Sequence, residues 1–281
     1  LADAAAQARA IAGGGGVGVE ADDITLARHA RLTELLDGVP AVATTGLVED
    51  LRVVKDPGEI DAMRRAAAVV DRALAAVLAG GIVGRPEREV AFALHGAMLA
   101  EGAEEPSFAT IVASGPRGAR PHHVPGPDPV PAGTLVVIDL GAVVDGYCSD
   151  MTRTVATGEA SPRLREVHGV CLDAQRAAMA AARPGMTAGD LDAVARTRIA
   201  EAGYGAGFGH GLGHGVGLAI HERPGVRPEG GEVLRAGMAI TIEPGIYLEG
   251  EGGVRIEDLV VLGEDGNDVL STSPKELRTV E

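Results

Sequence analysis

Cysteine, aromatic residues and basic residues are all scarce in this chain, and no long apolar run is present. The two cysteines, Cys148 and Cys171, fall in segments predicted as strand and helix, so neither a disulfide framework nor a thiolate zinc site is expected. Lys and Arg total 25 against 40 Asp and Glu, a formal charge of −15, which opposes a phosphate-neutralising surface for nucleic acid. No stretch approaches the roughly 20 apolar residues of a membrane span, and no secretory signal is recognisable. We therefore expect a globular, cytoplasmic protein with neither a nucleic-acid nor a membrane partner.

The chain is long enough to bury a substantial core. It has 281 residues, of which 46% are hydrophobic, and this length allows one large domain with a smaller one. Residues 1–51 predict two helices and two short strands near Val17 and Val42. The longer helices and richer β segments begin after this point, so we assign 52–281 to the main domain.

Capping residues mark the first two helices of the main domain. Asp56-Pro57-Gly58-Glu59 predicts a capping box with proline at the first helical position. Gly80-Gly81 ends that helix, and a second one is expected from about Pro86 to Ala100.

The same order of elements then repeats. Val, Ile, Leu and Thr dominate 107–115 and 134–157, which favours antiparallel strands. Helices are predicted again at 162–182 and 188–202, before strand-like, Gly-rich segments return from 208 onward. The fold class predicted is therefore α+β, with an internal duplication of helix, helix and strands.

Two aspartates border the first β-rich region. Asp139 closes the apolar run Val136-Val137-Ile138, and Asp150 follows the turn Asp145-Gly146. A carboxylate at the end of a buried strand is costly unless a cation or hydrogen bonds compensate it, which makes Asp139 a candidate metal ligand. The alternative is an aspartate that forms a turn or pairs with Arg153.

Histidines and glycines alternate in the second half. Three of the eight histidines, His210, His214 and His221, fall within twelve residues. Alternating glycines let the backbone pass close to a ligand or another strand, and imidazole supplies a nitrogen donor for a transition metal. The glycines do not fit a nucleotide-binding loop.

Two glutamates complete the candidate set. Glu243 and Glu257 each follow an isoleucine in an apolar segment, and two neighbouring strands would bring them to one metal pair. Solvated acids on a surface hairpin are the alternative for either glutamate alone. Together the clusters supply four carboxylates and several imidazoles, which suits two divalent ions such as Mn²⁺, Co²⁺ or Zn²⁺.

These residues carry a family resemblance. The ordered set and its flanking motifs resemble the pita-bread metallopeptidases, over about residues 52–281. Gly253-Val254-Arg255-Ile256-Glu257-Asp258 and Pro121-His122 are similar to the proline-selective members, the prolidases and aminopeptidases P, with His123 as the local competitor of His122. The metal ligands that the resemblance implies are Asp139, Asp150, His214, Glu243 and Glu257.

The resemblance also implies a fold and a reaction. It predicts a pita-bread fold whose two halves surround a curved antiparallel sheet, and two divalent ions, with Mn²⁺ the first choice. A metal-bridging hydroxide would attack the carbonyl of an Xaa-Pro bond, with Glu243 as general base. His221, His210 and His122 would stabilise charge, position substrate or relay protons, and Arg255 and Tyr247 would support the ligands.

Several alternatives stay open at the level of sequence. The substrate is expected to be a small peptide with proline at its second position, but nothing separates a dipeptidase from an aminopeptidase acting on longer peptides. Some relatives of this fold lack metal and act as small-amide hydrolases or binding proteins. Residues 1–51 resemble the end of an amino-terminal creatinase/prolidase-type domain with its linker, and a homodimer is expected.

Overall fold

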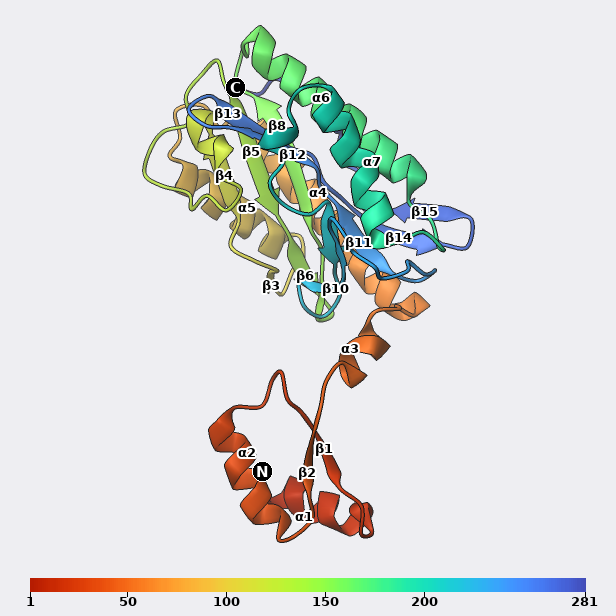
Figure 1. The fold of residues 1–281 in the computed structure, drawn as a ribbon. Coiled ribbons are helices and arrows are strands. Elements are labelled where there is room, and N and C mark those ends of the chain that lie inside the picture. Colours follow the sequence, from red (N-terminus) through yellow and green to blue (C-terminus); the bar gives the residue numbers. More distant parts are fainter. The chain divides into compact units, whose positions relative to one another are not determined.

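The computed structural model describes all residues 1–281, which divide into two compact units, Leu1–Arg52 and Val53–Glu281. The first unit contains two parallel strands connected by a helix, as Figure 1 shows. Its elements are α1 (Ala2–Ala12), β1 (Val17–Glu20), α2 (Leu26–Leu36), β2 (Ala41–Thr44) and α3 (Leu47–Arg52). The predicted alternation of helix and strand is therefore present in this unit.

The second unit begins with a helix pair and a set of short strands. These elements are α4 (Pro57–Ala79), α5 (Glu87–Ala100), β3 (Glu105–Pro106), β4 (Ile111–Ser114), the 3₁₀ turn Gly115–Ala119, β5 (Leu135–Leu140), β6 (Ala142–Val144), β7 (Tyr147–Cys148) and β8 (Met151–Ala156). The predicted capping box is formed, because the Glu59 N–H donates to Asp56 Oδ1 and the Asp56 N–H donates to Glu59 Oε2.

The same order then repeats in the second half of the unit. Its elements are α6 (Pro162–Ala181), α7 (Ala188–Glu201), the 3₁₀ turn Gly205–Gly207, β9 (Gly213–Gly215), β10 (Glu222–Val226), β11 (Ala239–Ile242), β12 (Gly245–Leu248), β13 (Gly252–Arg255), β14 (Asp258–Gly263) and β15 (Gly266–Val269). Ser161 and Thr187 cap α6 and α7 by accepting hydrogen bonds from backbone N–H groups three residues on.

The strands of this unit are all antiparallel and fall into four groups. Their orders are β4-β5-β8, β3-β6-β7, β12-β13 and β10-β9-β11-β14-β15. The groups touch through β13, which contacts β5 and β8, and through β14, which contacts β8. The sheet is thus interrupted where β11 gives way to β12 and β13 gives way to β14, and these breaks free two glutamates for the site described below.

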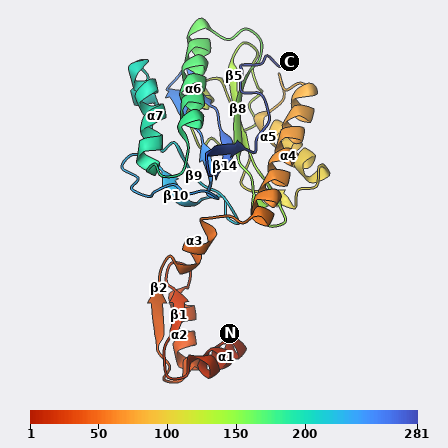
Figure 2. The same ribbon diagram turned by 90° about the vertical axis from the view of Figure 1, so that its right-hand side faces the viewer.

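The helices cover the strands in two pairs. Helices α4 and α5 contact β4, β6 and β7, whereas α6 and α7 contact β10, β11 and β13. Figure 2 shows the two pairs on opposite sides of the view, with β5, β8 and β14 between them. Separate apolar clusters, one including Leu94 and Ile138 and the other Leu191 and Ile240, fill the two halves. Each such fully buried side chain contributes about 2 kcal/mol of apolar transfer free energy.

None of the helices combines the length and the apolar character that crossing a bilayer would demand.

Candidate metal centre

The two aspartates reach the site from neighbouring strands of the first half. Asp139 lies within β5, paired with Thr152 of β8 and Ile111 of β4. Asp150 immediately precedes β8, and both aspartates are buried. The strand register therefore presents two carboxylates at one end of the β4-β5-β8 group.

The other three candidate ligands come from the second half. His214 is in β9, which passes between β10 and β11 so closely that a Cβ at Gly213 would collide with the Thr241 carbonyl oxygen and a Cβ at Gly215 with the Arg223 carbonyl oxygen. The glycines flanking His214 are thus required by packing. Glu243 and Glu257 lie at the breaks after β11 and before β14, rather than within strands as the sequence had indicated.

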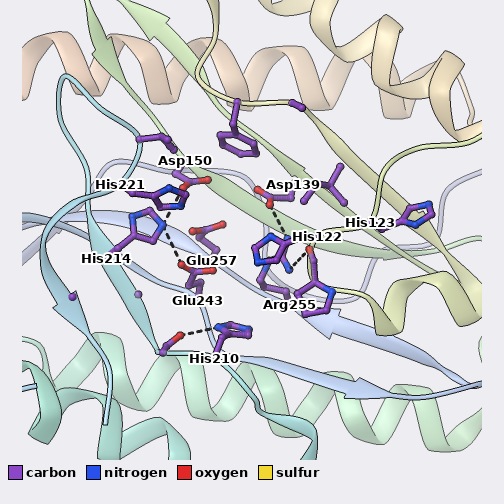
Figure 3. Close-up of a pocket in the computed structure, with 18 of the residues that line it drawn as sticks. His122, His123, Asp139, Asp150, His210, His214, His221, Glu243, Arg255 and Glu257 are labelled. Carbon is purple, nitrogen blue, oxygen red and sulfur yellow. Dashed lines mark hydrogen bonds and ion pairs between the residues drawn. The ribbon is translucent and has the colours of Figure 1, made fainter. Parts of the chain in front are cut away.

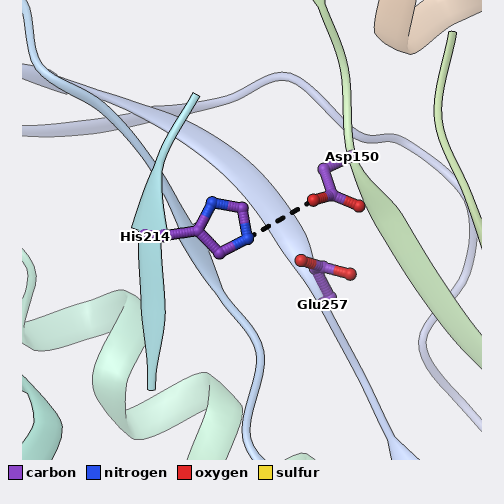
Figure 4. Close-up of side chains that lie close together, drawn as sticks. All are labelled: Asp150, His214 and Glu257. Carbon is purple, nitrogen blue, oxygen red and sulfur yellow. Dashed lines mark ion pairs between the residues drawn. The ribbon is translucent and has the colours of Figure 1, made fainter. Parts of the chain in front are cut away.

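These five side chains converge in one place. His214 Nε2 lies 3.3 Å from Glu243 Oε1 and 3.6 Å from Asp150 Oδ2. Asp150, His214 and Glu257 each offer a ligand atom, and these atoms lie within 4.8 Å of one another. Figure 4 shows the three side chains directed toward one another. His214 Nδ1 lies 3.0 Å from its neighbour's carbonyl, Gly215 O. A proton on Nδ1 leaves the Nε2 lone pair directed at the carboxylates, which is the orientation that a ligating histidine needs.

A pocket of about 580 Å³ encloses the cluster. It is lined by nine of the ten residues that the sequence singled out, and Figure 3 shows most of them directed at its centre. The tenth, Tyr247, lies just behind the wall. Its hydroxyl is 2.9 Å from His210 Nε2 and accepts a hydrogen bond from Arg255 Nη1 at the same distance. Phe108, Ile111 and Ile220 add an apolar side.

Arg255 organises one side of the cluster. Its Nη2 donates to Asp139 Oδ2 at 2.7 Å and its Nε donates to Thr152 Oγ1 at 2.9 Å. The alternative prediction, that Asp139 pairs with Arg153, is wrong. Arg153 instead pairs with Asp258 at 2.7 Å on the far side of the strand. Side chains alternate between the two faces of a strand, so Arg153 points to the face opposite to that of Asp150 and Thr152.

Two threonines that sequence reasoning missed hold the glutamates. Thr152 Oγ1 donates to Glu257 Oε2 at 2.6 Å, and Thr241 Oγ1 donates to Glu243 Oε1 at 3.0 Å. Thr241 Oγ1 also accepts the backbone N–H of His214. The sequence spacing could have predicted both threonines. Thr152 follows Asp150 by two residues and Thr241 precedes Glu243 by two, and this spacing places side chains on one face of a strand.

The remaining histidines differ in how they are held. His210 Nδ1 lies 2.8 Å from Gly211 O, so with Nδ1 protonated its Nε2 accepts from the Tyr247 hydroxyl. The His221 ring packs edge-on against His214 with 4.4 Å between centroids. His122 and His123 both line the pocket, but His122 is exposed and lies beside Arg255, whereas the His123 ring points away from the ligand cluster and binds Glu87.

The buried carboxylates of the cluster repel one another, and this changes their pKa values. Burial, reinforced by the neighbouring carboxylates, raises the pKa of Asp150 and Glu257 well above the ordinary values and raises that of Asp139 less. Burial also acts to raise the pKa of Glu243, but the hydrogen bond and charge of His214 outweigh it and lower that pKa. Four acids this close cannot all carry charge without a compensating cation.

Comparison with known proteins decides the family. Residues 61–264 match the profile of metallopeptidase family M24. The chain belongs to this family. It is 47% identical over 231 residues to the Xaa-Pro dipeptidase of Pyrococcus furiosus, covering 82% of this chain and 66% of that relative's length. The chain thus spans slightly less than two thirds of the length of that relative.

Solved M24 structures agree in fold. The Xaa-Pro dipeptidase from Bacillus anthracis matches with a TM-score of 0.96 and 42% identity, over 99% of this chain and 78% of that one. The X-Pro aminopeptidase from Thermotoga maritima MSB8 matches with a TM-score of 0.91 and 40% identity, over 95% of this chain and 76% of that one. The predicted α+β pita-bread fold is confirmed.

The residues present fit the divalent metal that an M24 metallopeptidase requires. Asp139 Oδ1 and Glu257 Oε1 are both buried and have no hydrogen-bond partner within the protein. Buried carboxylate oxygens are normally satisfied. In each residue the second oxygen is held by Arg255 or Thr152, which leaves the first oxygen without a partner in the protein. A cation would satisfy both atoms and relieve the repulsion among the acids.

Proposed function

We propose that this M24 protein hydrolyses the Xaa-Pro bond of dipeptides or of peptide amino termini, with two divalent ions held by Asp139, Asp150, His214, Glu243 and Glu257. The convergence of these five donors in one pocket is the observation that carries the proposal. It is supported by the activities of the relatives, which are Xaa-Pro dipeptidases and an X-Pro aminopeptidase.

The size of the donor set favours two ions over one. A single catalytic ion such as Zn²⁺ is typically held by three protein ligands, whereas four carboxylates and an imidazole meet here. Carboxylates and imidazole suit Mn²⁺, Co²⁺ and Zn²⁺, and we propose Mn²⁺ as the first choice. When bound, such ions supply a Lewis acid that polarises the scissile carbonyl and lowers the pKa of water.

The proton transfer is assigned to Glu243. Hydrolysis adds water across the C–N bond, so that the carbonyl carbon gains the hydroxyl and the prolyl nitrogen gains a proton before it leaves. Glu243 lies at the pocket wall with one oxygen held by Thr241. We assign it the role of general base, taking the proton from water and delivering it to the prolyl nitrogen.

The pocket histidines act on the substrate side. His221 packs edge-on against His214 and lines the pocket, and we propose that it donates a hydrogen bond to the developing oxyanion. His122 reaches in from the opposite wall. His210 is partly buried and lies 2.9 Å from the Tyr247 hydroxyl, and we assign it a positioning role at the floor of the site.

The test combines metal content with turnover. After loading with Mn²⁺ and removal of free metal, we expect close to two ions per chain and cleavage of Gly-Pro to glycine and proline. Removal of metal with a chelator should abolish cleavage, and Mn²⁺ should restore it. Asp150→Ala should lower kcat by at least about a thousandfold while leaving the circular dichroism spectrum unchanged, because it removes a ligand at the centre of the cluster.

Two results would contradict the proposal. One is fewer than one ion per chain together with no activity, which would favour a metal-free binding protein or small-amide hydrolase. The other is unchanged turnover by Asp150→Ala. Incubation with Gly-Pro and with a longer Xaa-Pro peptide, followed by mass analysis of the products, separates the dipeptidase from the aminopeptidase.

Assembly and domain roles complete the proposal. We propose a homodimer, which sedimentation equilibrium of the full chain would test. We also propose that residues 1–51 correspond to the end of an amino-terminal creatinase/prolidase-type domain and that 52–281 form the catalytic domain.

A further inference from the structure

Glu87 is a buried carboxylate outside the ligand cluster. It is the first residue of α5, yet none of its surface is exposed. A glutamate is rarely buried unless its charge is paired. Its Oε1 accepts hydrogen bonds from the Ser114 N–H at 2.8 Å, the Ser114 hydroxyl at 2.7 Å and Arg117 Nε at 2.8 Å. Its Oε2 binds His123 Nε2 at 2.8 Å.

All of these partners belong to one segment, residues 114–126, which the Gly126 N–H also ties to Glu87 Oε2 at 3.4 Å. After a short 3₁₀ turn, this segment has neither helix nor strand. Its residues 121–124 form one wall of the pocket. A segment without regular hydrogen bonding depends on side-chain anchors for its position. Glu87 is the main anchor on the side facing away from the pocket.

A second anchor acts from inside the pocket. Arg255 Nη1 donates to the Pro121 carbonyl oxygen at 3.2 Å, and the same guanidinium holds Asp139. The wall segment is therefore fixed at Pro121 by the ligand cluster and at His123 by Glu87. His122 lies between the two anchored residues.

His122 depends on these anchors because it has none of its own. It is exposed and makes no hydrogen bond with the protein, whereas the side chain of His123 is only 9% exposed. Figure 3 shows His122 beside Arg255 at the pocket and His123 directed away from it. Holding the His123 ring on Glu87 therefore selects which of the two adjacent histidines faces the cluster.

The charge of Glu87 suits this task. Burial acts to raise the pKa of the Glu87 carboxyl, but the hydrogen bonds from Ser114, His123 and Arg117 outweigh burial and hold the pKa below its ordinary value. A carboxylate accepts at both oxygens, whereas an amide accepts at only one. A glutamine at this position would direct its NH₂ group, a donor, at the donors that now bind one of the two carboxylate oxygens.

We propose that Glu87 is a positioning residue for Xaa-Pro hydrolysis, which holds His122 over the ligand cluster by fixing His123 and the 114–126 segment. This inference rests on the function proposed above. It predicts that the effect of Glu87 on the reaction passes through His122, whereas a purely structural anchor would act independently of it.

A double-mutant cycle tests the dependence. Glu87→Gln and His122→Asn should each lower kcat/KM for Gly-Pro by about tenfold, in line with the loss of one interaction to a charged group. The double variant should be no slower than His122→Asn alone, because removing His122 removes what Glu87 positions. Glu89→Gln, an exposed acid in the same helical turn, is the matched control and should leave kcat/KM unchanged.

A spectroscopic readout needs no turnover. The imidazole Cε1–H resonance of His122, identified by its loss in His122→Asn, should shift or broaden in Glu87→Gln and stay in place in Glu89→Gln. Should Glu87→Gln fail to fold, His123→Gln breaks the same link from the other partner and should give the same cycle and the same spectral change.

The inference would be overturned if the fold losses in kcat/KM of the two single variants multiplied in the double variant. It would also be overturned if the His122 resonance did not move in Glu87→Gln. If the wild-type protein cleaves no Xaa-Pro peptide, the proposed function fails instead. The His122 resonance then decides by itself whether Glu87 holds that residue.

Discussion

Two arginines line the pocket, and their surroundings differ. Arg255 is buried, and its guanidinium is used by Asp139, Thr152, Tyr247 and a backbone carbonyl. Arg227 follows β10 at the rim and is exposed, and its side chain forms no ion pair or hydrogen bond with the protein. An exposed guanidinium at the rim of the proposed substrate pocket can pair with a carboxylate through two parallel hydrogen bonds. A dipeptide, but not a longer peptide, presents its carboxylate one residue beyond the scissile bond.

Arg227→Ala should therefore weaken the binding of Gly-Pro in particular. We expect its KM for Gly-Pro to rise about 10- to 100-fold, the range for one charge-assisted pair, with little change for the Gly-Pro amide. Steady-state kinetics on the two substrates measures this. Arg223→Ala is the control, because Arg223 is an exposed arginine within β10 that does not line the pocket. Equal effects of Arg227→Ala on both substrates would contradict carboxylate recognition.

Among the elements, helix α7 fixes the Gly-rich segment that precedes β9. Asp192 is buried and accepts hydrogen bonds from the Leu212 N–H at 3.0 Å and from Arg196 Nε and Nη2. Arg196 in turn donates to the carbonyl oxygens of Phe208 and His210, and its guanidinium lies 4.2 Å from the Phe208 ring centroid. Residues with so many glycines lack intrinsic rigidity. The helix supplies that rigidity.

Asp192→Ala should lower the free energy of unfolding by about 2–4 kcal/mol. It leaves the Leu212 N–H unpaired and deprives the largely buried Arg196 of its counter-charge. Urea denaturation at pH 7 measures the loss. Asp190→Ala, an exposed acid in the first turn of the same helix, should cost less than about 1 kcal/mol. Similar costs for the two variants would show that the Asp192 contacts do not stabilise the fold.

For the whole molecule, a histidine remote from the site links stability to pH. His168 of α6 is 3% exposed, and its Nε2 has no hydrogen-bond partner. Burial lowers the pKa of His168 to about 4, against a small opposing effect of Glu276. Unfolded histidine titrates near pH 6.5. Between these pH values the unfolded chain binds a proton that the folded chain does not.

The stability contributed by neutral His168 is therefore complete above pH 6.5 and decreases as the pH falls from 6.5 to 4, by roughly 3 kcal/mol in total. His168→Leu removes this titration while keeping an apolar side chain in the space. Urea denaturation of both proteins at pH 7 and pH 4.5 should show a smaller loss of stability on acidification for the variant, by about 2–3 kcal/mol. Parallel losses in the two proteins would exclude His168 as a contributor.

Much of the fold could be predicted because its signals are local. The Asp56–Glu59 capping box and the Ser161 and Thr187 caps involve atoms three residues apart, so their hydrogen bonds can be inferred from neighbouring letters. The turn at Asp145-Gly146, with both φ angles positive, is equally local. The order of helices and strands, and with it the duplicated α+β fold, follows from such signals and from apolar periodicity.

The side-chain partners within the site could not be predicted from the sequence, because they depend on which strands meet and in what register. Arg153 is closer in sequence to Asp139, yet strand alternation turns it away and Arg255, 116 residues from Asp139, takes its place. The adjacent His122 and His123 could not be told apart by type, and the buried Glu87 separates them. The sequence by itself determined the element order, the chemistry of the donors and the family they resemble. Only the tertiary structure decided which donors share one pocket and what holds each of them, since those contacts join residues that approach only when the two halves pack together.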